Sequence, residues 1–271
     1  MPTLAHSQVT APGSAPGRWL LVLHGLLGRG SNWRTLTRAL VSARPDWGAV
    51  LVDLRMHGDS LGFPPPHTVQ AAAEDLDGLA AQLPGPVEGV LGHSLGGKVA
   101  LAWAAVARGL RHALILDTNP GPRPLGEGSE TSKEVLSVLR SLPAVLPSRQ
   151  AFIAQVQAAG QPAALAAWLA MSLQPQAGGF RFGLDMEAMA SLLSDVLGRD
   201  DWAVLTSPPA GLRFSFILGG RSRTVRGEAL RRLQTLAADG RLDLTVLAEA
   251  GHWLQVDDPV GTLRAVTEAL R

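Results

Sequence analysis

A serine at position 94 stands in a pattern that favours nucleophilic chemistry. The motif GHSLG (92–96) directly follows an apolar run, VEGVL (87–91), and precedes the helical stretch KVALAWAAVA (98–107). A sharp turn from strand to helix needs glycine on both sides of the serine, because a Cβ there would crowd the neighbouring strand or helix. The turn holds the serine at a helix N-terminus, where the dipole and free N–H groups favour developing negative charge. Ser94 is therefore predicted to be a nucleophile.

The same residues overlap a phosphate-binding pattern. Gly92 to Lys98 also reads G-x-x-x-x-G-K, the loop that cradles nucleotide phosphates. That loop requires Ser or Thr at the next position to bind Mg²⁺, and Val99 stands there instead. A nucleotide-binding function is disfavoured on this ground. His93 is expected to orient the turn rather than to transfer protons.

His252 has the position and chemistry of a general base. The sequence AGHW (250–253) follows the last apolar run of the chain, LDLTVL (242–247), and precedes the last helical stretch. Nucleophile first and histidine last is one of the chain orders known for a catalytic serine and its base. Imidazole, with an ordinary pKa of about 6.5, suits proton transfer at neutral pH. We expect His252 to lie at the same edge of the sheet as Ser94.

Two backbone N–H groups are predicted to form an oxyanion hole. The motif HGLLG (24–28) follows the first central strand, and Gly25 lets the chain turn so that the next N–H faces the nucleophile. The N–H groups of Leu26 and Leu95 would then stabilise the oxyanion of a tetrahedral intermediate. His24 is expected to support this loop rather than to catalyse.

The acid that orients His252 is the least determined member of the site. No Asp or Glu follows the run RFSFIL (213–218) until Glu228, which lies inside the next helical stretch. Asp117 ends a strand beside the nucleophile strand, and Asp185 lies in the segment before RFSFIL. An acid at either place could accept the Nδ1 proton of His252. Asp117 is favoured because it lies at the functional edge of the sheet.

The composition limits the class of protein. The chain has 271 residues, of which 46% are hydrophobic and 17% charged, a net charge of +1 and no cysteine. These values predict a globular chain and exclude disulfides, and they give no sign of a nucleic-acid partner. No secretory signal is recognisable, and the longest apolar run is too short to span a bilayer. We expect a cytoplasmic protein without a membrane span. Its oligomeric state is not determined by the sequence.

Short apolar runs alternate with helical patterns along the chain. This alternation predicts an α/β fold with a doubly wound, mostly parallel sheet. The predicted helices are 32–43, 68–83, 96–107, 225–237 and 259–270, and the predicted strands are 19–24, 49–53, 87–91, 113–117, 213–218 and 242–247.

One long connection interrupts the alternation. Residues 118–212 carry helical patterns near 131–141, 149–159, 163–173 and 185–197 and are bounded by proline-rich turns. We interpret them as a helical cap inserted into a core made of 1–117 and 213–271. Trp168, Met171 and Met189 are expected to shape an acyl pocket under this cap.

Taken together, the motifs resemble a known superfamily. HGLLG (24–28), DLRMHGDS (53–60), GHSLGGK (92–98) and GHW (251–253) are similar to α/β-hydrolases, in particular to small bacterial esterases such as YbfF and their abhydrolase relatives. The resemblance covers nearly the whole chain beyond the N-terminal arm. It implies that Ser94 and His252 are nucleophile and base, that Leu26 and Leu95 form the oxyanion hole, and that Asp53, Arg55 and His57 brace a turn. A relocated acid at the place of Asp117 also occurs in this branch.

The resemblance implies hydrolysis of carboxylic esters or thioesters without a cofactor or metal. The partner would be a small acyl ester or thioester, cleaved through an acyl-enzyme. Two alternatives stay open: a lyase, C–C hydrolase or perhydrolase that uses the same triad, and a non-catalytic ligand-binding module. Arg221, Arg223 and Arg226 could hold an anionic substrate, although a solvated basic loop is the favoured interpretation. His6, His67 and His112 have no comparable setting and are expected at the surface.

Overall fold

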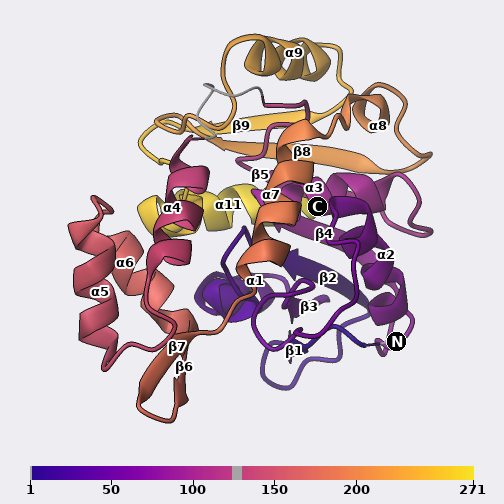
Figure 1. The fold of residues 1–271 in the computed structure, drawn as a ribbon. Coiled ribbons are helices and arrows are strands. Elements are labelled where there is room, and N and C mark those ends of the chain that lie inside the picture. Colours follow the sequence, from indigo (N-terminus) through magenta and orange to yellow (C-terminus); the bar gives the residue numbers. More distant parts are fainter. Residues whose placement is uncertain (1, 124–129) are drawn as a thin grey trace.

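A twisted sheet forms the centre of the molecule in the computed structural model, which describes residues 2–123 and 130–271. Among these residues the sheet has seven strands, and all but the first run parallel. In spatial order they are β1 (His6–Val9), β3 (Trp47–Val52), β2 (Arg18–Leu23), β4 (Val87–His93), β5 (His112–Leu116), β8 (Arg213–Gly219) and β9 (Asp243–Leu247). The six predicted strands are all present, and the predicted fold class is confirmed (Figure 1).

The apolar character of the inner strands follows from cover on both faces. Every residue of β3 and β5 is buried, as expected where helices cover the two sides of a parallel sheet. The strand that the sequence did not reveal, β1, pairs antiparallel with β3 at the edge. Its four residues HSQV expose most side chains and have no apolar run to indicate a strand.

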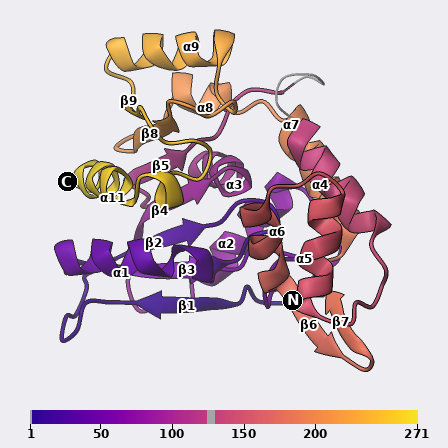
Figure 2. The same ribbon diagram turned by 90° about the vertical axis from the view of Figure 1, so that its left-hand side faces the viewer.

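Helices cover both faces of the sheet (Figures 1 and 2). One core cluster packs α1 (Arg34–Ala43), which follows a short 3₁₀ turn (Gly30–Trp33), and α11 (Pro259–Ala269) against the sheet. The other cluster packs α2 (Val69–Ala80), α3 (Leu95–Ala104) and α9 (Gly227–Ala238) against the opposite face. The doubly wound arrangement brings the carboxyl ends of β2, β4 and β5 to one edge, where the predicted site residues lie.

The segment between β5 and β8 packs beside this edge (Figure 2). Its elements are α4 (Glu130–Ser141), α5 (Arg149–Ala158), α6 (Ala163–Leu169), a 3₁₀ turn (Ala170–Ser172), β6 (Leu173–Gln176), β7 (Gly179–Phe182), α7 (Met186–Gly198) and α8 (Trp202–Thr206). The hairpin β6–β7 was not predicted. Its turn contains Gly178 at positive φ. The helix predicted over 163–173 ends earlier, at Leu169, and Leu173 already begins β6.

A buried lysine fastens this inserted segment to the helix behind Ser94. Lys98, in α3, is 2% exposed, and its Nζ donates hydrogen bonds to the carbonyls of Pro120, Gly121 and Arg199. It also lies 3.4 Å from the Asp201 carboxylate. Burial lowers the pKa of Lys98 to about 8, against the opposing pull of Asp201. The two ends of the inserted segment therefore meet at one cation.

Candidate active site

Ser94 occupies a strained turn between β4 and α3. Its backbone has φ 54° and ψ −115°, a left-handed conformation that is rare for any residue other than glycine. A Cβ on Gly92 would lie 2.1 Å from the Gly96 carbonyl oxygen, and one on Gly96 would lie 2.5 Å from that of Leu23. The crowding expected from the sequence is therefore real. The turn is further tied down by the Ser94 N–H, which donates to the carbonyl of Leu116.

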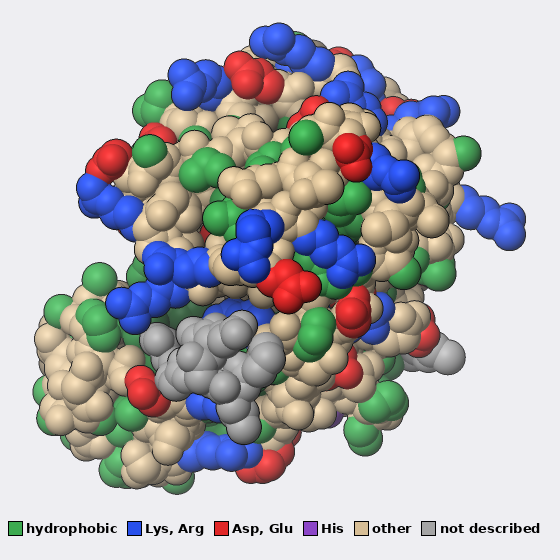
Figure 3. Space-filling view, turned by 90° about the horizontal axis from the view of Figure 1, so that it is seen from above, with side chains coloured by type: hydrophobic (Ala, Val, Ile, Leu, Met, Phe, Trp, Pro, Cys, Tyr) green, Lys and Arg blue, Asp and Glu red, His purple; other side chains and the backbone are tan. Residues whose placement is uncertain are grey.

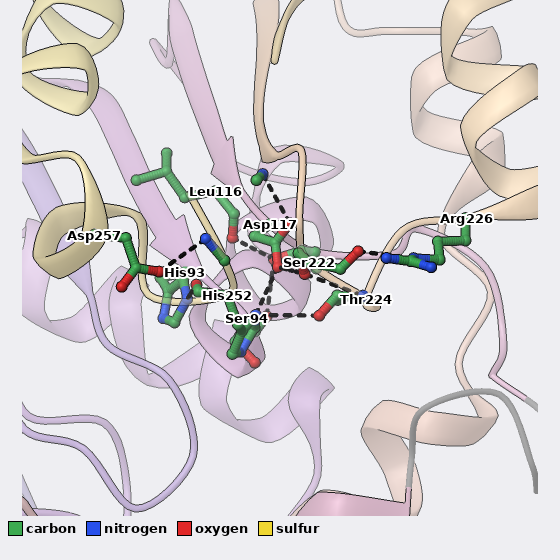
Figure 4. A network of polar contacts seen from close by, with 12 residues as sticks. His93, Ser94, Leu116, Asp117, Ser222, Thr224, Arg226, His252 and Asp257 are labelled. Carbon is green, nitrogen blue, oxygen red and sulfur yellow. Dashed lines mark hydrogen bonds and ion pairs between the residues drawn. The ribbon is translucent and has the colours of Figure 1, made fainter. Parts of the chain in front are cut away.

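His252 meets the carboxylate of Asp117. It lies on the loop between β9 and α10 (Leu254–Asp257), and its Nδ1 is 2.6 Å from Asp117 Oδ2 (Figure 4). The His252 side chain is 37% exposed, whereas Asp117 is fully buried. A buried carboxylate that accepts the Nδ1 proton fixes the tautomer in which Nε2 is free to act as a base.

Several donors hold the Asp117 carboxylate in its ionised form. Burial alone would raise its pKa, but hydrogen bonds from His252, Ser222 and Gly219 outweigh burial, and the pKa lies below its ordinary value. The Ser222 hydroxyl donates to Oδ2 at 2.5 Å, and the Gly219 N–H donates to Oδ1 at 3.2 Å. Asp117 itself has a φ of 42°, so the end of β5 is turned to present the side chain.

A second side chain from the loop after β8 reaches the histidine. Thr224 Oγ1 lies 3.1 Å from His252 Nδ1, beside the Asp117 oxygen (Figure 4). Neither Ser222 nor Thr224 was predicted, because only an acid was expected on this loop. Their hydroxyls occupy the place where that acid was sought, so the lack of an acid after β8 was the signal that could have found them.

The rival acids lie elsewhere. Asp185 is the N-cap of α7, and its Oδ1 accepts hydrogen bonds from the N–H groups of Glu187 and Ala188. Glu228 lies in the first turn of α9. Of the three carboxylates considered from the sequence, the structure brings Asp117 to His252.

The two predicted oxyanion groups belong to the turn at Ser94 and to the HGLLG loop beside it. A Cβ on Gly25 would lie 3.3 Å from Ser94 Cβ, so the HGLLG loop passes directly beside the nucleophile turn. Among the hydrogen bonds of residues 2–123 and 130–271, none has the N–H of Leu26 or of Leu95 as its donor. Neither N–H is therefore taken up by an acceptor of the described residues, as the predicted oxyanion hole requires.

Three buried histidines support these loops. His57 Nε2 accepts the N–H of Leu27, and His24 Nε2 accepts the N–H of Leu54. The ring of His93 packs 4.6 Å from that of His252, with Nε2 2.8 Å from the His252 carbonyl oxygen. Burial lowers the pKa of His24 to about 4 and the pKa values of His57 and His93 to about 3.

At neutral pH these three rings are uncharged hydrogen-bonding groups, as the structural roles expected for His24, His57 and His93 require. The prediction for His112 was wrong. It is buried, with Nδ1 3.0 Å from the Ala269 carbonyl oxygen, because β5 runs through the middle of the sheet.

A cavity of about 570 Å³ opens beside Ser94 and His252. The sheet domain contributes the HGLLG loop, Trp33 and α10, and the inserted segment contributes α4 and α6. Its walls are mainly apolar and include Leu165 and Trp168 of α6 and Trp253 of the histidine loop. The rings of Trp168 and Trp253 lie 5.6 Å apart and join the inserted segment to the histidine loop.

Two side chains expected in this pocket lie outside it. Met171 is 53% exposed beyond α6, and Met189 is fully buried in the packing of α7. Neither is among the described residues that line the cavity. Only Trp168 of the three predicted pocket residues contacts it, because helical periodicity does not reveal which face of an inserted helix meets the sheet domain.

The arginines after β8 also lie away from the cavity. Arg221 pairs with Glu249 at the surface, and Arg226 Nε donates to the Ser222 carbonyl. Arg223 is exposed, and none of the three lines the cavity among the described residues. Figure 3 looks onto the face that carries α9 and shows Lys and Arg side chains spread over it with Asp and Glu between them. These observations match a solvated basic loop.

Within residues 2–123 and 130–271, no group of three or more His, Asp or Glu side chains is placed to hold a metal ion. Within that part of the chain, no helix has the length and apolarity needed to cross a membrane.

Comparison with known proteins agrees with this geometry. The model of the "Alpha/beta hydrolase family" matches residues 20–265. The chain belongs to the α/β hydrolase family. It is a serine hydrolase of that family. It shares 30% identity over 258 residues with the mouse (Mus musculus) sn-1-specific diacylglycerol lipase ABHD11, covering 93% of this chain and 80% of the relative.

Two further relatives show the breadth of the family. The 2-succinyl-6-hydroxy-2,4-cyclohexadiene-1-carboxylate synthase of Yersinia pseudotuberculosis is 27% identical over 267 residues, covering 93% of this chain and 89% of that protein. The structure of a marine microorganism esterase superposes with a TM-score of 0.83 at 21% identity, covering 99% of both chains. The narrower resemblance to YbfF-like esterases stays a prediction.

Proposed function

We propose that the protein hydrolyses carboxylic esters or thioesters through an acyl-enzyme on Ser94. In the first step Ser94 Oγ attacks the acyl carbonyl while His252 takes the hydroxyl proton. The Leu26 and Leu95 N–H groups stabilise the oxyanion, and His252 gives its proton to the leaving alcohol or thiol. Water then attacks the acyl-enzyme with His252 again as the base, which releases the acid and restores Ser94.

The contact between His252 Nδ1 and the buried Asp117 carboxylate carries this proposal. A histidine held by a carboxylate next to a serine in a strained strand-to-helix turn is the arrangement that activates a hydroxyl as a nucleophile. Ser94 and His252 both line the same cavity. The orienting acid and the cavity together favour catalysis over a non-catalytic binding module.

The inserted segment, residues 118–212, is proposed to act as a cap that supplies the acyl pocket. Its helices α4 and α6 provide Val135, Leu165 and Trp168 to the cavity, opposite the HGLLG loop. Apolar walls around a few polar groups suit an acyl chain. The ends of the segment are held by Lys98, so the cap is fastened to α3, the helix that directly follows Ser94.

The variant Ser94→Ala tests the proposal. Short-chain 4-nitrophenyl esters should be hydrolysed by the wild type, and the variant should lose on the order of 10⁴-fold or more in kcat while its circular dichroism and Tm stay close to wild type. A folded variant that keeps more than about a tenth of the wild-type rate would show that Ser94 is not the nucleophile.

A lyase function on the same triad is the second candidate. It is favoured by the identity to the Yersinia synthase, whose product is by name a carboxylate. The lining of the cavity disfavours this function, because no Lys or Arg is among its described residues to bind a carboxylate. Hydrolysis of neutral 4-nitrophenyl esters separates the two, since a lyase would leave these esters intact.

A further inference from the structure

The charge distribution of the cavity has a consequence for the substrate. Of the described residues that line it, Asp257 is the one Asp, Glu, Lys or Arg side chain. The other polar side chains around it are neutral, among them Asn32, Ser132 and Gln255. Residues 124–129, which the structure does not describe, have the sequence PLGEGS and contain no cation.

The nearby cations are directed elsewhere. Arg29, next to the HGLLG loop, forms an ion pair with Asp59. Helix α4 separates two cavities: Ser132 and Val135 line the one beside Ser94, whereas Lys133 and Arg140 line a second cavity toward α7. No described basic side chain of the inserted segment lines the cavity beside Ser94.

Asp257 lines the same cavity as Ser94 and His252. It is exposed at the end of α10, and its Oδ2 accepts the N–H of Gly251, next to His252 (Figure 4). No ion pair of the described residues includes Asp257, so its charge is not neutralised by a neighbouring side chain. A second carboxylate in the same apolar cavity would meet repulsion and lose its hydration without a compensating cation.

We propose that the cavity selects uncharged acyl groups over acyl groups that end in a carboxylate, with Asp257 as the specificity-determining residue. The inference rests on the proposed hydrolysis at Ser94 and names the class of its substrate. This charge selection can be tested separately from any preference for acyl-chain length, because the compared substrates can have the same number of carbons.

A matched pair of esters tests the proposal. 4-Nitrophenyl hexanoate and mono-4-nitrophenyl adipate carry six-carbon acyl chains that differ in a terminal carboxylate. We expect kcat/KM to be at least tenfold higher for the hexanoate in low salt. Asp257→Asn, which keeps an acceptor for the Gly251 N–H, should narrow this ratio at least threefold, and 0.5 M NaCl should narrow it for the wild type.

Two further variants sharpen the comparison. Asp258→Asn makes the same change in charge at the neighbouring N-cap of α11, outside the cavity, and should leave the ratio unchanged. Val256→Arg places a cation at the exposed edge of the cavity and should narrow the ratio even if Asp257→Asn does not fold.

The outcomes separate the two claims. Equal rates on both esters, or a ratio that neither Asp257→Asn nor Val256→Arg changes, would overturn the charge selection and leave the proposed function standing. Hydrolysis of neither ester, together with no labelling of Ser94 by a fluorophosphonate, would overturn the proposed function and the inference with it.

Discussion

Replacing Asp117 with asparagine tests the orientation of the catalytic histidine. The carboxylate accepts hydrogen bonds from His252, Ser222 and Gly219. The amide oxygen of asparagine can still accept the Gly219 N–H, but its NH₂ group then stands where Oδ2 accepts the His252 Nδ1 proton. The ring would hold its proton on Nε2 instead, and Nε2 could no longer accept the Ser94 proton.

The size of the loss follows from the neighbouring hydroxyl. A triad with the wrong tautomer loses about 10⁴-fold in kcat. Thr224 Oγ1, 3.1 Å from Nδ1, can accept the Nδ1 proton in part of the molecules and so reduces the loss. We therefore expect Asp117→Asn to lose between about 10²-fold and 10⁴-fold in kcat, and Asp117→Asn/Thr224→Asp to regain part of the rate.

The assay is steady-state hydrolysis of 4-nitrophenyl butyrate, with Tm and circular dichroism to confirm folding. Asp185→Asn is the control for an acid of the inserted segment, and it should change kcat less than about twofold because Asp185 only caps α7. A folded Asp117→Asn variant with more than about a tenth of the wild-type rate would refute the reasoning. A large loss of kcat in Asp185→Asn, together with an active Asp117→Asn variant, would show that Asp185 of the inserted segment is the catalytic acid.

Two further predictions concern the cap and the buried lysine. Trp168→Ala removes the cavity wall opposite Trp253 and should change the ratio of kcat/KM for 4-nitrophenyl octanoate to that for 4-nitrophenyl butyrate at least threefold. Met171→Ala, outside the cavity, should leave this ratio unchanged. The same ratio in both variants would contradict a role of the cap in acyl-chain preference. Burial lowers the pKa of Lys98 from 10.5 to about 8, so the unfolded chain binds more protons between these values and the free energy of unfolding should rise by roughly 2–3 kcal/mol from pH 8 to 10.5. Urea unfolding at several pH values measures this rise, because the chain has no Tyr, no Cys and only one other lysine, the exposed Lys133, that could titrate in this range. Lys98→Met should abolish the rise, and Lys133→Gln should keep it. A free energy of unfolding that does not change with pH in the wild type would contradict the lowered pKa of Lys98.

The sequence predicted the parts of the site that depend on local patterns. Ser94 lies in a turn that needs glycine on both sides, and His252 follows the last strand, so both positions are encoded by neighbours along the chain. Asp117 could be predicted from its place at the end of a strand beside the nucleophile strand. The inner parallel strands were recognisable because burial on both faces leaves continuous apolar runs, as in β3 and β5.

The parts that depend on contacts between distant segments could not be predicted. Ser222 lies 105 positions from Asp117, and a hydroxyl that donates to a carboxylate has no pattern of its own in the sequence. The three carbonyls around Lys98 come from both ends of the inserted segment, so the lysine was notable only as part of a disfavoured phosphate loop. The position of α6 over the cavity depends on how the segment packs against Trp253.

Labelling with a fluorophosphonate is the most direct test of the central claim, that Ser94 is a nucleophile activated by His252. Intact mass spectrometry should show one covalent adduct per chain, and peptide mapping should place it on Ser94. His252→Ala should slow the labelling by at least about a hundredfold, because the hydroxyl then has no base. An adduct on another residue, or labelling that is as fast without His252, would contradict the account.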